Sequence, residues 1–164
     1  MNTHTRFALA ASLLGGLLTT AVHAEDLKVS NAWVREAPPT SAVNAAYMHI
    51  ANPGATDRTL TGASSPQFET VEIHRTEIVD GMARMLPQKQ LVVPAGGSVT
   101  LEPNGLHLML IQAKQPLHAG DHVEIDLHAD GGAALKIDAE VRPDREGDMP
   151  EGMDHSQHMQ HMQH

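Results

Sequence analysis

Residues 122–142 of the chain read HVEIDLHADGGAALKIDAEVR. Apolar residues alternate with polar or charged ones on both sides of the Gly131-Gly132 pair. Alternation at period two is typical of a β-strand with one face in a core, and a Gly-Gly pair favours a tight turn between two such strands. The stretch therefore predicts an antiparallel hairpin with strands at His122–Asp130 and Ala134–Arg142.

Similar short segments, separated by Gly, Pro and Asn, fill the chain from residue 27 to residue 143, and no ten-residue helical stripe occurs. The other predicted strands are Lys28–Arg35, Ala45–Ala51, Arg58–Ala63, Glu69–Ile78, Met82–Leu86, Ser98–Leu101 and Leu106–Ala113. Eight or nine strands in about 120 residues are typical of an all-β Greek-key sandwich or small barrel. We see no internal repeat.

The first 24 residues have the pattern of a secretory signal peptide. A positive residue, Arg6, precedes an apolar run from Phe7 to Ala21, and small residues end the segment at Ala24. Such a run is short for a membrane span, and no lipid-accepting Cys follows it. We therefore expect export to a bacterial periplasm or to the exterior, cleavage after Ala24 and no stable membrane anchor after that cleavage.

Composition narrows the possible functions of the expected mature chain, residues 25–164. The full chain has 11 basic and 20 acidic side chains, and removing the signal peptide leaves 10 basic ones and a formal charge of -10. Without basic clusters, such an acidic chain is a poor partner for nucleic acid. The chain has no Cys, so neither a disulfide nor a blue-copper thiolate site is expected.

The apolar run Asn104–Ile111 contains the most informative pair of side chains. His107 and Met109 are two residues apart, so in a strand both face the same side, and the leucines between and beside them face the core. Twenty-one residues lie between Met85 and His107, and ten residues lie between His74 and Met85. Two imidazoles and two thioethers favour Cu(I) over zinc, calcium or magnesium. The alternative interpretation is that the methionines fill the core and the histidines bond to backbone.

A turn at Asp80-Gly81 allows this grouping to be checked. If those two residues form a two-residue hairpin turn, Thr76 lies opposite Met85, and His74 becomes a diagonal neighbour of Met85 on one face. A longer loop would shift the register by one residue and place the two donors on opposite faces.

Several segments resemble the periplasmic PCuAC-type copper chaperones. They are Ala32-Trp33-Val34-Arg35 followed by Pro38-Pro39, Ala45-Ala46-Tyr47 before Asn52, Val71-Glu72-Ile73-His74, Val93-Pro94-Ala95-Gly96-Gly97, Gly105-Leu106-His107-Leu108-Met109-Leu110, and Pro116-Leu117 before Gly120-Asp121. One departure is Arg75, where some members carry a second Met. The likeness covers most of residues 25–143, which we take as one domain.

The resemblance implies a cupredoxin-like β-sandwich that holds one Cu(I) near its surface. Carried across residue by residue, the copper ligands of the family fall on His74, Met85, His107 and Met109. It further implies delivery of Cu(I) to an apo CuA domain, in subunit II of cytochrome c oxidase. Other periplasmic copper proteins or thiol-redox proteins are further expected partners.

After Pro143 the composition changes to a segment rich in Met, His and Gln. From residue 149 onward it has no Val, Ile, Leu or aromatic residue, so residues 144–164 are expected to form a disordered tail. Imidazole-rich ligation suits Cu(II), and we expect this tail to bind additional copper as Cu(II), although a solvated low-complexity end is the alternative. The candidate tail ligands are Met149, Met153, His155, His158, Met159, His161, Met162 and His164.

Two other functional classes are compatible with parts of the pattern. A periplasmic sequestration or resistance protein would use the same donors without a dedicated acceptor, and a metal-free scaffold module would use none of them. The sequence shows no nucleophile-base set and no phosphate-binding glycine loop, so we do not predict an enzyme.

Overall fold

The computed structural model describes residues 27–132 and 134–143. These residues form ten strands, which are β1 (Lys28–Arg35), β2 (Val43–Ala51), β3 (Arg58–Ser64), β4 (Phe68–Val79), β5 (Met82–Pro87), β6 (Leu91–Val93), β7 (Ser98–Leu101), β8 (Leu106–Ala113), β9 (His122–Ala129) and β10 (Leu135–Arg142). The described part of the chain contains no helix long and apolar enough to cross a membrane. The predicted signal peptide and the predicted tail lie outside the described residues.

The all-β prediction is confirmed. β1, β7 and β8 have the predicted bounds, and the other predicted strands differ by one or two residues at their ends. The sequence interpretation missed β6, because three residues between Gln90 and Pro94 are too few to show an alternation. The hairpin between β9 and β10 forms at Gly131 and Gly132, which both have positive φ angles.

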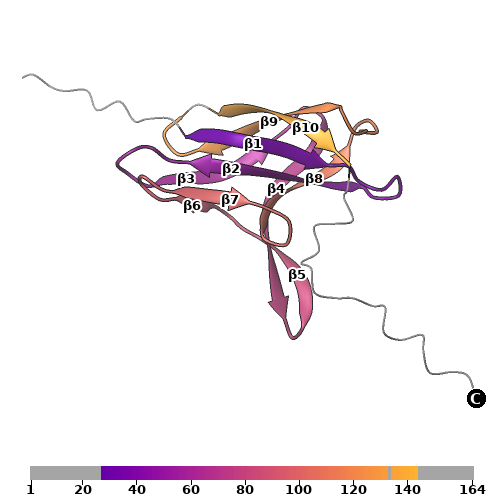
Figure 1. The fold of residues 1–164 in the computed structure, drawn as a ribbon, viewed down its shortest axis with the longest axis horizontal. Coiled ribbons are helices and arrows are strands. Elements are labelled where there is room, and N and C mark those ends of the chain that lie inside the picture. Colours follow the sequence, from indigo (N-terminus) through magenta and orange to yellow (C-terminus); the bar gives the residue numbers. More distant parts are fainter. Residues whose placement is uncertain (1–26, 133, 144–164) are drawn as a thin grey trace, which may run out of the picture.

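The strands follow one hydrogen-bonded path, β5-β4-β8-β2-β1-β10-β9-β3-β6, and β7 also pairs with β2. β1 runs parallel to β10 on one side and antiparallel to β2 on the other. The first and last strands of the domain therefore lie side by side. The path folds over itself (Figure 1). One core of buried and mostly aliphatic side chains lies within it. Ile50, Leu110, Val123 and Ile125 in that core are fully inaccessible to solvent.

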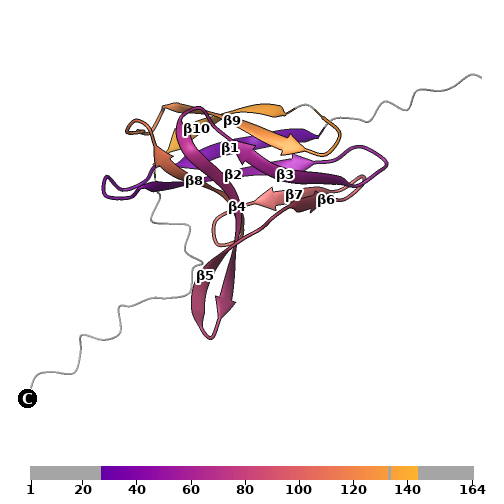
Figure 2. The ribbon, with the colours of Figure 1, turned by 180° about the vertical axis from the view of Figure 1, so that it is seen from behind.

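The hairpin of β4 and β5 projects from the rest of the domain, which we call the body. β4 pairs with β8 as far as Arg75 and beyond that point pairs only with β5. We call residues 76–87 the arm, and both views show it projecting from the body (Figures 1 and 2). Its turn residues Asp80 and Gly81 have φ angles of 53° and 76°, as a two-residue hairpin turn requires. Since β5 is the end of the strand path, one side of the arm is an open sheet edge.

Candidate metal centre

The two predicted imidazole ligands come together where β4 leaves the body. His74 on β4 pairs directly with His107 on β8. Their ring centroids are 6.0 Å apart, and the rings are inclined by 46°. Both residues are buried, with 7% of His74 and 5% of His107 exposed. The pairing joins residues from distant parts of the chain, so periodicity alone could not have predicted it.

The arm brings the first thioether to the same face. Thr76 pairs with Met85, which is the register that a two-residue turn at Asp80-Gly81 predicts. His74, Thr76 and Met85 therefore lie on one face of the two strands. Unlike the histidines, Met85 is 60% exposed.

The second thioether lies inside the sheet. Met109 follows His107 by two residues on β8, and it pairs with Glu72 on one side and Ala45 on the other. It is half-buried. Met85, His107 and Met109 all line a cavity of about 330 Å³, and Tyr47 and Arg35 also contribute to its wall. His74 is not among the residues that line this cavity, although it is the direct neighbour of His107.

A carboxylate sets the orientation of His74. The Nε2 atom of His74 lies 2.7 Å from Oε2 of Glu72. Because a carboxylate only accepts hydrogen bonds, Nε2–H is the donor, and in the neutral imidazole the lone pair is then on Nδ1. That Nδ1 atom is buried and has no hydrogen-bond partner in the part of the chain that the structure describes. A buried nitrogen lone pair without a partner is costly unless it meets a ligand, so this atom fits a metal-binding role.

His107 is oriented by the backbone. Its Nδ1–H donates to the carbonyl oxygen of Gly105 over 3.1 Å, which leaves the lone pair on Nε2. Burial lowers the pKa of His107, the Gly105 bond opposes that effect, and the nearby His74 and Arg35 lower the pKa further. His107 therefore remains a neutral donor at neutral pH, as copper ligation requires.

The surrounding charges do not form a conventional hard-ion site. Among residues 27–132 and 134–143, no three His, Cys, Asp or Glu side chains gather in a way that could hold a metal ion. The two imidazole nitrogens form a four-donor site only together with the thioether sulfurs of Met85 and Met109. Such a donor set is soft and neutral, which suits Cu(I). Arg75 points to the face opposite His74, because it is the next residue along the strand.

Sequence reasoning did not identify Glu72 as a partner of His74. The signal was present in the spacing, because residues two apart on a strand share a face, and Val71-Glu72-Ile73-His74 alternates apolar with polar residues. The predicted tail ligands lie outside the described residues.

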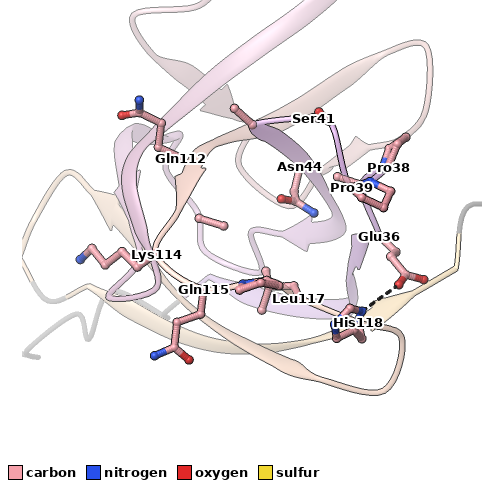
Figure 3. A pocket seen from close by; sticks show the side chains of 14 residues that line it. Glu36, Pro38, Pro39, Ser41, Asn44, Gln112, Lys114, Gln115, Leu117 and His118 are labelled. Carbon is pink, nitrogen blue, oxygen red and sulfur yellow. Dashed lines mark ion pairs between the residues drawn. The ribbon is translucent and has the colours of Figure 1, made fainter.

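A larger cavity, of about 690 Å³, lies beside the one at the metal residues and contains none of the four predicted ligands. The 36–44 segment and residues 112–118 form its wall (Figure 3). An ion pair between His118 and Glu36, with 3.6 Å between Nδ1 and Oε1, closes one side. Glu36, Pro38 and Asn44 line both cavities.

Residues 27–141 match the LpqE-like family model. The chain belongs to this family. It is also 30% identical over 149 residues to "Putative lipoprotein Lxx21020" of Leifsonia xyli subsp. xyli, a match that covers 84% of this chain and 89% of that protein.

Solved structures agree with the resemblance to PCuAC domains. The apo form of DR1885 from Deinococcus radiodurans is 33% identical, with a TM-score of 0.57, and the match covers 90% of this chain and 97% of DR1885. The Cu(I) form of DR1885 is 32% identical with the same TM-score, over 76% of this chain and 81% of that one. The copper-bound PCuAC domain from PmoF2 has a TM-score of 0.62 at 22% identity, over 73% of this chain and 95% of that domain, and so it supports the fold alone.

Proposed function

We propose that this protein is a periplasmic copper chaperone that binds one Cu(I) through His74, Met85, His107 and Met109. The observation that carries the proposal is the pair of buried imidazoles. Each ring donates one N–H to a fixed acceptor, Glu72 or Gly105, so the lone pair of the neutral ring lies on the other nitrogen. Fixed partners of this kind orient histidine ligands in known metal sites, and two thioethers lie on the same face to complete a soft donor set.

A relative supports copper as the cargo, because DR1885, which is 32% identical to this chain, has been solved with Cu(I). The donor set contains neutral imidazoles and thioethers and no anionic thiolate. Such a set suits a protein that must release its copper. The exposed position of Met85 further favours release, because a partner can reach that side of the site directly.

For the acceptor, we propose an apo CuA domain of cytochrome c oxidase subunit II. Sequestration without an acceptor is the second candidate, and the same donors would serve it. The two are distinguished by mixing the Cu(I)-loaded protein with an apo CuA domain and measuring the copper content of each protein after separation. Stoichiometric transfer supports delivery, whereas copper retained by this chain supports sequestration.

For the remainder of the chain, we propose a signal peptide over residues 1–24 and a tail over residues 144–164 that binds Cu(II). The lipoprotein description of the Leifsonia xyli relative is compatible with export, although this chain contains no Cys to accept a lipid. The tail carries four His and four Met between Met149 and His164. Titrating Cu(II) into the full chain and into a chain that ends at Pro143, followed by electron paramagnetic resonance, tests the tail. Equal Cu(II) stoichiometry in both would rule the tail out.

A further inference from the structure

The arm carries two thioethers whose exposed fractions are nearly equal. Met82 and Met85 are 57% and 60% exposed, and every residue of β5 is exposed. Met48, by contrast, is 2% exposed inside the core, and Met109 is half-buried between β2 and β4. Since β5 is the end of the strand path, no further strand among residues 27–132 and 134–143 shields Met82 or Met85.

The two exposed thioethers face opposite sides of the arm. Met85 pairs with Thr76, on the face that carries His74, whereas Met82 pairs with Val79 on the other face. Successive residues of a strand alternate between faces, so three positions along β5 place Met82 on the side turned away from the metal residues. Only one of two comparably exposed sulfurs is therefore a candidate copper ligand.

Exposure determines how readily a thioether is oxidised. The sulfur attacks one oxygen of a peroxide, an S–O bond forms while the O–O bond breaks, and the sulfur loses two electrons. With a proton transfer, the second oxygen leaves as water when the oxidant is hydrogen peroxide. The product is methionine sulfoxide, whose remaining sulfur lone pair is a far poorer donor to Cu(I) than that of the thioether. The chain has no Cys to react with the peroxide first.

We propose that Met85 is a peroxide-sensitive modification site that controls loading of the metal centre. In the metal-free protein its thioether is open to oxidation, and oxidation prevents Cu(I) from gaining its fourth donor. In the loaded protein the same lone pair is bound to the metal and the sulfur is protected. This inference rests on the proposed function, since it takes Met85 as a ligand, but it adds a chemical modification that switches the site off.

The protection experiment uses the full chain and Ag(I), a soft monovalent ion that does not react with peroxide as Cu(I) does. The protein is treated with dilute hydrogen peroxide with and without Ag(I), and the sulfoxide at each methionine is followed by peptide mass spectrometry. Without metal, Met82 and Met85 should oxidise at similar rates, and Met109 and Met48 more slowly. With Ag(I), Met85 alone of the arm pair should slow to the rate of Met48. Equal rates at Met82 and Met85 with Ag(I) bound, or a slow Met85 without metal, would overturn the proposal.

The loading experiment tests the consequence. Wild type, Met82→Leu and Met85→Leu are oxidised, freed of peroxide, and compared in Cu(I) competition against a chromophoric chelator. Oxidation should lower the Cu(I) affinity of wild type and Met82→Leu by about tenfold or more, to the level of untreated Met85→Leu. When the treatment is stopped before peptide mass spectrometry detects sulfoxide at Met109, Met85→Leu should lose no further core affinity. The methionines beyond residue 143 are the same in all three proteins.

The outcomes separate this inference from the function beneath it. If untreated protein has no tight Cu(I) site that His107→Leu removes, the proposed function fails. If that site exists and Ag(I) protects Met85, yet oxidation leaves Cu(I) affinity unchanged, only the oxidation switch fails. If the site exists and Ag(I) protects neither arm methionine, Met85 is not a ligand and the switch fails with it.

Discussion

The two histidines and Met85 form one candidate site but belong to very different regions of the molecule. His74 and His107 are buried, paired across two strands of the body and each held by a fixed acceptor. Met85 lies on an exposed edge strand of a hairpin that projects from the body. The two imidazoles are therefore oriented before metal arrives, whereas the sulfur on the arm remains open to solvent and to a partner.

The largest effect is expected from the buried half. His107→Leu roughly keeps the volume of the side chain but removes a preoriented nitrogen donor, so Cu(I) affinity should fall by more than about 100-fold. Competition against a chromophoric Cu(I) chelator measures this change. A variant that binds within a few-fold of wild type would show that the imidazole pair is not the centre of the site.

A smaller loss is expected at the exposed half. Met85→Leu should lower Cu(I) affinity by about 10- to 100-fold. Because the Met85 side chain is mostly exposed, the free energy of unfolding of this variant in urea should stay within about 0.5 kcal/mol of the wild-type value. Met82→Leu is the matched control on the other face and should change neither quantity. Equal losses in the two variants would mean that the arm acts by a nonspecific effect.

Glu72 contacts the candidate site through its hydrogen bond to His74, so we expect it to affect metal binding through that ring. Glu72→Gln should weaken Cu(I) binding by about tenfold, as is typical when the partner of a ligating histidine is lost. Nitrogen NMR of the His74 ring provides a readout that a general structural role would not move, since the amide no longer requires a donor at Nε2. Glu69→Gln, an exposed position on the same strand, should leave the ring signals and the affinity unchanged.

The smallest effect is expected on the stability of the metal-free protein. Burial lowers the pKa of His107 in the fold, so below the ordinary value of about 6.5 the unfolded chain takes up its proton more readily. This contribution to stability is present above that pH and is lost as pH falls toward the lower folded pKa. Urea unfolding at pH 7.5 and pH 5.5 should show a larger loss for wild type than for His107→Leu. An equal loss would contradict the assigned direction of the pKa.

Local chemistry made parts of this site predictable. A two-residue turn at Asp80-Gly81 predicts that Thr76 lies opposite Met85, whereas a longer loop would have shifted that register. The structure has the two-residue turn, with positive φ angles at both residues, and pairs Thr76 with Met85. The shared face of His107 and Met109 likewise follows from their spacing of two. These expectations depend only on residues near one another in sequence.

Other features depend on contacts that no local pattern encodes. The pairing of His74 with His107 requires β4 and β8, with three other strands between them in the chain, to align in one register. The projection of the arm follows from the point where β8 begins, at Leu106, because the pairing of β4 with β8 ends at Arg75. The partner of His74 at Glu72 was readable from spacing, but its hydrogen bond needed the side-chain geometry.

The most direct test of the central claim is X-ray absorption at the copper edge on protein carrying one Cu(I), in a chain that ends at Pro143. We predict two nitrogen and two sulfur scatterers in the wild-type domain. Met109→Leu, which roughly conserves side-chain volume, should reduce the sulfur count by one. A sulfur count that does not change in this variant would contradict the assignment of Met109, and an absence of sulfur scatterers in the wild-type domain would contradict the site as a whole.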